Sequence, residues 1–306
     1  MQNCKLCPRN CGVNRAKEET GICGMTKDVK IARAALHYWE EPCISGVNGS
    51  GTIFFSGCNL HCVYCQNVSI AKGRQGSIIS IEQLAQVCLD LQLQGAHNIN
   101  LVTPNHYIPQ IKQALIFARE KGLCIPIVYN TSSYEYPSAL QQLEGEISIY
   151  LADLKYVSAG LSEKYSHAKD YFSVACKAIA EMVRQVGTPQ FVSNGENTNY
   201  TEYEDGMLMQ KGVIVRHLLL PGCLEDSKEV IRYLYETYGN MIYISIMNQY
   251  TPLAHVAKYP ELNRKVSEAE YEELVDYAIE LGVECGFIQE GDTASESFIP
   301  DFNGSK

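Results

Sequence analysis

From residue 51 onward, short apolar runs rich in β-branched and aromatic residues alternate with longer amphipathic runs. The short runs, which predict strands, are Thr52–Ser56, Asn98–Thr103, Ile125–Asn130, Ile147–Ala152, Val213–Leu219 and Met241–Ile246. The longer runs, which predict helices, are Ile81–Gln94, Pro109–Lys121, Glu135–Leu143, Tyr171–Val186 and Glu225–Tyr238. Nearly continuous apolar strands that alternate with helices predict a parallel sheet covered by helices. The pattern therefore predicts an α/β fold, an incomplete (β/α)6 TIM-type barrel, with a doubly wound open sheet as the alternative.

The remaining segments have weaker patterns. Val192–Gln210 is polar with little periodicity, which predicts a long loop of the kind that often serves as a lid or a binding element. Ser267–Leu281 predicts a C-terminal helix, and Glu284–Gln289 predicts a short edge strand. The predicted domains are a cysteine-rich N-terminal segment over residues 1–50, the partial barrel over residues 51–290 and a loose tail over residues 291–306.

Three cysteines, Cys58, Cys62 and Cys65, lie within eight residues directly after the first predicted strand. A cubane iron–sulfur cluster has four irons and normally takes four cysteine ligands, so three cysteines leave one iron open. An open position is typical of a reacting metal centre. A closed zinc site with His61 is the alternative, but adjacent residues rarely both bind one tetrahedral ion. Unliganded core cysteines are a second alternative that this tight spacing disfavours.

The C-x3-C-x2-C motif of Cys58, Cys62 and Cys65 resembles the signature of the radical S-adenosylmethionine (SAM) superfamily. The resemblance implies that the three cysteines hold a 4Fe–4S cluster whose open iron binds the methionine part of SAM. Reductive cleavage of SAM then gives a 5′-deoxyadenosyl radical that abstracts hydrogen. Tyr64, the aromatic residue before the last cysteine, is implied to lie against the adenine.

Polar residues recur after successive predicted strands. They are Thr103–Tyr107, Tyr129–Ser132, Asp153–Lys155 and Asn248–Tyr250, and Arg216–His217 lie on the fifth predicted strand, leading into its end. Any one of them is by default a loop or cap residue. Their repetition at the same end of the predicted strands is informative, because the loops at that end of a barrel carry its chemistry. The sequence therefore predicts a rim that holds the polar parts of a cofactor.

The whole chain is similar to the pyruvate formate-lyase activating enzyme-like branch of that superfamily, with an N-terminal cysteine segment. The similarity rests on Gly57–Asn67, Asn100–Tyr107, Tyr129–Tyr134, Tyr150–Tyr156 and Val215–Gly222. It implies that Asp153 and Lys155 contact SAM. It also implies that Asn130 lies near the ribose, and that Arg216 or His217 approaches the SAM carboxylate or ribose. The implied partners are a glycyl-radical enzyme as substrate and an electron donor such as flavodoxin or ferredoxin.

The chain departs from that branch after the second predicted strand. The Gly-Gly-Glu element that usually holds the SAM amino group is replaced by Thr103-Pro104-Asn105-His106. Proline donates no backbone hydrogen bond, so the amine is expected to meet carbonyl groups or the side chains of Thr103 and Asn105. The ferredoxin-like insert of some activating enzymes is also absent, and the extra cysteines come first instead.

Four cysteines near the N-terminus, Cys4, Cys7, Cys11 and Cys23, form the pattern C-x2-C-x3-C-x11-C. The surrounding segment is poor in aliphatic residues and cannot fold by burying a core. Metal binding then supplies the missing free energy. Four thiolates predict either structural zinc or a second iron–sulfur cluster. Cys43 is a possible substitute for one of the four ligands.

Composition and net charge disfavour several cellular roles for this chain. The net charge of −10 disfavours binding to nucleic acid or to an anionic membrane, because both need a basic surface. No apolar run approaches the roughly 20 residues that span a bilayer, and the cysteine-rich N-terminus does not look like a secretory signal. With 13 cysteines and no export signal, we expect a cytoplasmic protein with reduced thiols.

The leading prediction is a radical-SAM oxidoreductase that installs a glycyl radical on a partner enzyme. Radical modification of a small molecule is the alternative within the same class. An iron–sulfur electron-transfer protein and a zinc-stabilised binding module are alternatives from other classes. Both are disfavoured because neither role needs so large an α/β scaffold.

Overall fold

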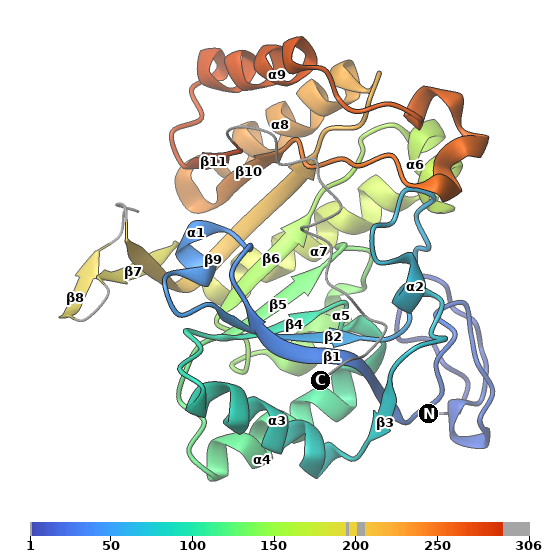
Figure 1. Cartoon of the computed structure of the whole chain (residues 1–306), viewed down its shortest axis with the longest axis vertical. Coiled ribbons are helices and arrows are strands. Elements are labelled where there is room, and N and C mark those ends of the chain that lie inside the picture. The colour runs from blue at the N-terminus through green and yellow to red at the C-terminus, as the bar shows by residue number, and fades with distance from the viewer. Residues whose placement is uncertain (1, 194–195, 201–205, 290–306) are drawn as a thin grey trace.

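The computed structural model describes residues 2–193, 196–200 and 206–289. One sheet dominates it, with strands in the order β11-β10-β9-β6-β5-β4-β2-β1-β3 (Figure 1). The strands on this path are β1 Val29–His37, β2 Ser50–Phe55, β3 Ser77–Ile79, β4 Ile99–Val102, β5 Ile127–Thr131, β6 Ile149–Asp153, β9 Met207–Leu218, β10 Tyr243–Met247 and β11 Gly286–Ile288. Two further strands, β7 Gln190–Ser193 and β8 Glu196–Tyr200, form a hairpin joined to β9.

The six predicted strands are β2, β4, β5, β6, β9 and β10, and neighbours among them pair in parallel. The predicted edge strand is β11, which pairs in parallel with β10. At the other end, β1 pairs antiparallel with both β2 and β3. Because β3 and β11 end the described sheet, the curved sheet stays open. The predicted fold class, an incomplete parallel α/β barrel, is confirmed.

Five long helices cover the outer face of the sheet. They are α3 Ile81–Leu93, α4 Ile108–Glu120, α7 Tyr171–Val186, α8 Leu224–Tyr238 and α9 Glu268–Leu281. Figure 1 shows α3 and α4 along one end of the sheet and α8 and α9 along the other. Ser80 and Ser267 start α3 and α9 with capping boxes that satisfy free backbone N–H groups. The predicted helices therefore lie close to where the sequence places them.

Shorter helical elements connect the strands. The α-helices are α1 Pro42–Ser45, α2 Val68–Ala71, α5 Pro137–Leu140 and α6 Ala159–Ser166. The 3-10 helices are η1 Arg15–Lys17, η2 Asn105–Tyr107, η3 Gln141–Leu143, η4 Gly239–Met241, η5 Ala254–Lys258 and η6 Pro260–Leu262. The helix predicted over Glu135–Leu143 is thus two short turns, α5 and η3, because Pro137 fixes a later start.

The two faces of the sheet bury different cores. The outer core, between strands and helices, includes Ile53, Leu101, Val215 and Ile244. The inner core is smaller and includes Val128, Ile149, Leu151 and Ile214, together with Cys43 and Ile44 of α1. Helix α1 therefore closes the interior of the barrel from its concave side (Figure 1). Cys43, at 1% exposed, belongs to this inner core, so it does not substitute for an N-terminal cysteine ligand.

Two predictions about organisation need correction. The segment over residues 1–50 is not one unit, because β1 is a strand of the main sheet and α1 packs inside it. The loop predicted over Val192–Gln210 instead contains the β7–β8 hairpin and the start of β9. Strands of four and five residues are too short for periodicity to identify them. The predicted tail, residues 291–306, lies outside the described residues.

Candidate functional site: a cysteine loop at the barrel rim

The loop from Gly57 to Asn67 carries three cysteines at the carboxyl end of β2. The backbone of this loop is tied to the barrel, since Gly57 N–H donates to Ile70 O at 2.9 Å and Val63 N–H donates to Tyr165 O at 2.8 Å. Leu60 and Tyr64 are 1% and 7% exposed and pack in the outer core. The barrel thus fixes the loop before any metal binds.

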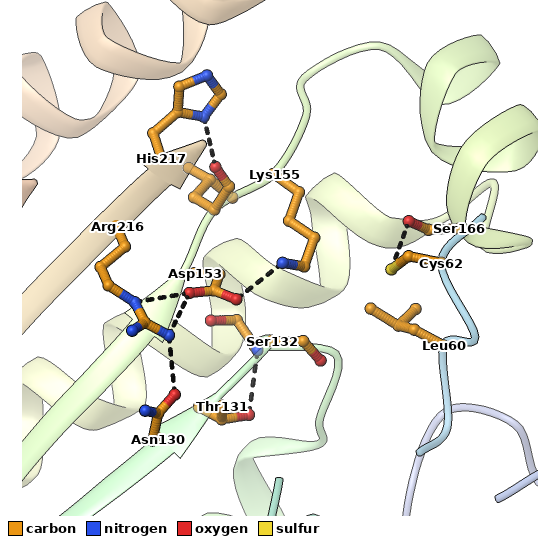
Figure 2. Close-up of polar contacts among 12 residues, drawn as sticks. Leu60, Cys62, Asn130, Thr131, Ser132, Asp153, Lys155, Ser166, Arg216 and His217 are labelled. Atoms are coloured by element: carbon orange, nitrogen blue, oxygen red, sulfur yellow. Dashed lines mark hydrogen bonds and ion pairs between the residues drawn. The ribbon is translucent and has the colours of Figure 1, made fainter. Parts of the chain in front are cut away.

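The thiols of this loop lie near one another and accept hydrogen bonds. The pKa of Cys65 is raised to about 12, mainly by burial and also by the neighbouring Cys58 and Cys62 thiols. Leu60 N–H donates to Cys58 Sγ at 3.4 Å, and Ser166 Oγ donates to Cys62 Sγ at 3.0 Å (Figure 2). A thiol this buried ionises when a metal replaces its proton. Hydrogen bonds to sulfur are among the groups that tune an iron–sulfur cluster.

The residues of this loop fit a 4Fe–4S cluster, because three cysteines without a fourth leave one iron open. A cubane places each cysteine on a different iron, so its thiolates need not meet at one point. His61 Nε2 lies 2.7 Å from Ile22 O, which takes the ring to the N-terminal segment rather than to its neighbour Cys62. The closed zinc site with His61 is therefore not supported.

Beside the cysteine loop, polar side chains from three parallel strands meet inside the barrel. Arg216 on β9 donates from Nε to Asp153 Oδ1 at 3.0 Å and from Nη2 to Asn130 Oδ1 at 2.8 Å. Lys155 Nζ donates to the other Asp153 oxygen at 2.7 Å (Figure 2). The strand pairing explains this meeting, because Asp153 and Arg216 are register partners and share one face of the sheet. Four predicted cofactor residues thus form one network.

Two acidic residues that the sequence analysis missed complete this network. Glu40 accepts from Arg216 Nη1 at 3.2 Å and from Asn130 Nδ2 at 3.3 Å. Glu41 accepts from Ser245 Oγ at 2.8 Å. Both come from the turn between β1 and α1, which enters the barrel interior. The adjacent acidic pair Glu40-Glu41, followed by a proline, is the signal in the sequence that could have found them.

The network is strongly coupled through charge. Burial alone would raise the pKa of Asp153, but Lys155 and Arg216 outweigh it and lower that pKa. Burial would likewise lower the pKa of Lys155, yet Asp153 and then Cys62 raise it. Burial raises the pKa of Glu41 to about 7, although Arg216 opposes the shift. Lys155 therefore links the carboxylate network to the cysteine loop.

His217 lies on the opposite face of β9 from Arg216. It pairs with Ile246, an outer-core residue, whereas Arg216 pairs with Ser245 inside the barrel. Its Nδ1 lies 2.8 Å from Leu154 O, and Figure 2 shows the ring turned away from Arg216. Burial lowers its pKa to about 4. Of the two residues predicted to approach SAM, Arg216 faces the interior and His217 does not, because successive strand residues alternate faces.

The segment that replaces Gly-Gly-Glu keeps a glycine-like backbone. Thr103 has φ +57°, a left-handed conformation that β-branched residues rarely adopt. Its N–H donates to Asn130 O at 2.9 Å, which holds the end of β4 against β5. Asn105 is buried, with Oδ1 3.0 Å from His106 Nδ1. The structure places Thr103 beside the network, and amine recognition by Thr103 and Asn105 stays a prediction.

Tyr64 is buried among other tyrosines. Its hydroxyl accepts from Tyr156 Oη at 2.7 Å, and its ring meets that of Tyr250 edge-on at 6.3 Å between centroids. Tyr156 Oη also lies 3.0 Å from Ser166 Oγ, the donor to Cys62. These contacts fix the ring beside the cysteine loop. Its contact with adenine stays a prediction.

The N-terminal cysteines Cys4, Cys7, Cys11 and Cys23 line one cavity. Burial raises the pKa of Cys7 to about 11, and the Cys23 and Cys11 thiols add to this shift. Burial also raises the pKa of Cys23, while the Arg15 guanidinium opposes it. The predicted grouping of the four thiols is therefore present, and all are free cysteines.

Known proteins resemble both the region of the cysteine loop and the chain as a whole. A family model described as "4Fe-4S single cluster domain" matches residues 45–141, which include the cysteine loop. The uncharacterized protein MJ0674 of Methanocaldococcus jannaschii is 26% identical over 288 residues, covering 91% of this chain and 75% of that protein. The name of that relative states no function.

Two solved structures of Streptococcus suis SuiB share the fold. SuiB bound to S-adenosylmethionine has a TM-score of 0.50 and 15% identity, covering 76% of this chain and 48% of SuiB. SuiB bound to precursor peptide SuiA gives the same score and identity, covering 76% and 46%. This chain therefore spans a little under half the length of SuiB.

The cysteine loop lies inside the matched 4Fe–4S region of an incomplete α/β barrel. This match and the shared fold support the resemblance of the cysteine motif to the radical-SAM superfamily. In the described part of the chain, no helix is both long and apolar enough to cross a membrane.

Proposed function

We propose that this protein reductively cleaves SAM at a 4Fe–4S cluster held by Cys58, Cys62 and Cys65. The observation that carries the proposal is the position of three half-buried thiols beside the Asp153–Lys155–Arg216–Asn130 network at one end of parallel strands. When bound, the cluster would supply one electron to the SAM sulfonium, giving methionine and the 5′-deoxyadenosyl radical. This chain's own residues then bind the cofactor and exclude water.

The residues of the network suit the polar groups of SAM. Lys155 donates to Asp153, and both Asp153 and the Cys62 thiol raise its pKa. Its ammonium would therefore meet the SAM carboxylate next to the cysteine loop. Arg216 is held by Asp153, Glu40 and Asn130, which makes it a fixed cation for the same carboxylate or a donor to the ribose. A preorganised charge of this kind costs little reorganisation when the ligand binds.

The test is anaerobic reconstitution with iron and sulfide, reduction, and addition of SAM. We expect 5′-deoxyadenosine from the wild type and none from Cys62→Ala. Cys124→Ala is the matched control, because Cys124 is exposed and remote from the loop in sequence. A reducible cluster that yields no 5′-deoxyadenosine with any supplied substrate would instead favour the iron–sulfur electron-transfer alternative.

We further propose a protein or peptide substrate, with glycyl-radical installation as the reaction. Similarity to the activating-enzyme branch supports the reaction, and the described sheet is open between β3 and β11, as expected for an enzyme that acts on a protein. SuiB, which shares the fold, was solved with a precursor peptide. The reaction would remove hydrogen from a glycine Cα and release 5′-deoxyadenosine.

The substrate test uses a purified glycyl-radical enzyme as the probe. We expect a glycine-centred radical in its electron paramagnetic resonance (EPR) spectrum after incubation with protein, SAM and reductant, and no such signal with Cys62→Ala. SAM cleavage without a protein radical would favour the alternative of a small-molecule substrate. Its electron donor would be a one-electron carrier such as flavodoxin or ferredoxin.

A further inference from the structure

The N-terminal cavity has features of a cluster site. Gly21 lies so close to Cys11 that a Cβ at residue 21 would sit 2.7 Å from Cys11 Sγ. Ile22 N–H donates to Cys11 Sγ at 3.3 Å. Arg15, 1% exposed, lines the cavity and donates from Nη1 to His106 O at 2.6 Å. A cation in the wall of this cavity suits a thiolate-bound metal centre, which carries negative charge whether it is zinc or a cluster.

The four N-terminal thiols share one cavity and could take either of the two metals that the sequence left open. Zinc would hold four thiolates about 2.3 Å from one point, and a 4Fe–4S cluster would take one thiolate on each iron. The two metals differ in what they can do beside the cysteine loop. A cluster can pass electrons to that loop, whereas zinc has no redox chemistry.

The N-terminal site and the cysteine loop are in direct contact. Asn59, next to Cys58, reaches the Cys7 thiol with its side chain. Asn59 Nδ2 also donates to Tyr134 O at 2.8 Å, which fixes the amide between the two sites. One side chain and one peptide bond thus separate a cysteine of one set from a cysteine of the other.

Arg9 makes a second connection. Its Nε donates to Asn59 O at 2.7 Å, and Nη2 donates to Ser166 O at 3.2 Å. Ser166 is the residue whose hydroxyl donates to Cys62 Sγ. Arg9 therefore holds both the loop and a donor to one of its sulfurs.

Glycine at residue 57 permits a third contact. Its φ is +91°, and a Cβ there would lie 2.6 Å from Cys23 O and 2.5 Å from Met25 Cγ. The backbone after Cys23 thus packs directly on the turn that begins the cysteine loop. Figure 1 places the N-terminal segment at the flank of the barrel, next to α2, the helix that ends this loop.

The charge of the N-terminal segment is opposite to that of the rest of the chain. Residues 1–30 contain six Lys or Arg and three Asp or Glu, a net charge of +3, whereas the whole chain carries −10. Lys5, Lys17 and Lys27 are exposed, and so are the acidic residues Glu18 and Glu19, while Arg15 is buried. The exposed side chains thus keep a small positive excess, which on an acidic protein would steer an acidic partner to this segment.

We propose that Cys4, Cys7, Cys11 and Cys23 bind a second 4Fe–4S cluster, which receives electrons from an acidic one-electron carrier protein and passes them to the cysteine loop. The proposal rests on the proposed SAM cleavage at Cys58, Cys62 and Cys65. In each turnover one electron leaves the reduced carrier, which is oxidised by one electron, and reaches the loop cluster by way of the N-terminal cluster. The same electron breaks the carbon–sulfur bond of SAM.

The first test counts metal without measuring activity. In a Cys58→Ala/Cys62→Ala/Cys65→Ala variant, we expect about four irons and four sulfides per chain to remain, and about eight of each in the wild type. The remaining cluster should give an EPR signal that SAM does not change, because all its irons are ligated. One zinc and no iron in this variant would overturn the proposal while leaving SAM cleavage intact.

The second test separates electron entry from structure. We expect Lys5→Glu/Lys17→Glu/Lys27→Glu to slow reduction of the loop cluster by reduced flavodoxin about ten-fold or more at low salt. The effect should fade near 1 M salt, where the Debye length is about 3 Å. Reduction by dithionite should be unchanged. Lys112→Glu, exposed on α4, is the matched control.

The outcomes remain distinct from failure of the main function. An unchanged flavodoxin rate in the triple lysine variant, with both clusters present, would overturn the electron route. Absence of 5′-deoxyadenosine from wild-type protein reduced by dithionite would count against SAM cleavage itself, whatever the metal count at the N-terminus.

Discussion

The two cysteine-bearing segments of this protein are supported in different ways. The loop Gly57–Asn67 buries Leu60 and Tyr64 in the outer core and bonds its backbone to Ile70 and Tyr165. In the described N-terminal residues 2–24, by contrast, only Arg15 is buried. The first segment is held by the barrel. The second has almost no core of its own.

This difference shows how one short chain can hold two metal sites of unlike character. A loop fixed by packing keeps its shape when one ligand stays free for a reaction, as an open site requires. A segment without a core needs all its ligands bound, because metal binding supplies the free energy of folding. The contacts of Asn59 and Arg9 then make the second segment depend on the first.

Backbone strain follows the same division. The left-handed non-glycine residues of the N-terminal segment are Asn3, Asn10 and Glu18, and asparagine tolerates this conformation well. Around the cysteine loop and the rim they are His61, Thr103 and Ser133, and Thr103 is β-branched. Among the described residues, only the barrel side of this comparison therefore holds a β-branched residue in the left-handed conformation.

The largest effect should come from removing a ligand of the loop. We expect Cys65→Ala to lower 5′-deoxyadenosine formation at least about a thousand-fold, because the cofactor carries the chemistry. Its melting temperature should fall by no more than about 4 °C, since packing and not metal holds the loop. Chromatography and thermal unfolding of the same preparation measure both. A globally unfolded Cys65→Ala protein would contradict the comparison.

Removing a ligand of the N-terminal site should do the reverse. We expect Cys11→Ala to expose residues 2–24 to rapid hydrogen exchange, because the segment loses the metal that folds it. The barrel helices α4 and α7 should keep their protection. Exchange measured by mass spectrometry on wild type and variant checks this. If residues 2–24 stay protected in metal-free Cys11→Ala, the segment folds without metal and the comparison fails.

The network tests how the barrel supports the loop. We expect Asp153→Asn to cost roughly 3–5 kcal/mol, because it leaves the buried cations Lys155 and Arg216 short of a partner. SAM affinity of the reconstituted protein should also fall. Urea unfolding and SAM titration measure the two effects.

His217→Gln is the matched control, since His217 is buried on the other face of the sheet. It should destabilise by roughly 1–3 kcal/mol through its lost contact to Leu154 O. SAM affinity should not change. If both variants lose SAM affinity equally, SAM does not bind on the interior face that Arg216 and Asp153 share.

The network was partly predictable from sequence. Polar residues after successive strands identified Asn130, Asp153 and Arg216, because strand ends in a parallel sheet meet at one edge. The choice between Arg216 and His217 was left open, yet period-two alternation allows only one of them to face inward. Glu40 and Glu41 were missed because their position inside the barrel depends on the antiparallel pairing of β1, which the sequence analysis did not predict.

The fold, like the network, was predictable from sequence only in part. The range of α7 was predicted without error, since a strong 3.6-residue pattern ends at Gly187. Strands β1 and β3 were missed because one segment was assigned to a metal-binding region and the other is three residues long. The grouping of the N-terminal thiols was predictable from spacing alone. Their contact with Asn59 was not, because it depends on tertiary packing.

A smaller effect should come from Glu41, which lies on the barrel side of the comparison. Its pKa is raised from 4.5 to about 7, chiefly by burial. The folded state then binds a proton more tightly than the unfolded state, so this group's stabilisation is present below about pH 4.5 and is lost as pH rises to about 7. Glu41→Gln should remove that loss and gain on the order of 2 kcal/mol at pH 8.

At pH 4.5 the two proteins should be about equally stable, because the Glu41 carboxyl is then protonated in the folded state. Ser245 can still donate to the amide oxygen of the glutamine. Urea unfolding at several pH values gives both slopes. A pH slope that is the same in wild type and Glu41→Gln would mean that Glu41 keeps an ordinary pKa.

The smallest effect should come from Thr103, where the rim is strained. A left-handed β-branched residue costs roughly 1–2 kcal/mol, and glycine would remove that strain. Glycine also adds freedom to the unfolded chain, which costs roughly 0.5–1 kcal/mol. Thr103→Gly should therefore stabilise by no more than about 1 kcal/mol. Thr103→Ala, which keeps a Cβ at φ +57°, is the matched control and should gain less. If Thr103→Gly destabilises the protein, the threonine side chain contributes more to the rim than its strain removes, and the strain contrast between rim and N-terminal segment is lost.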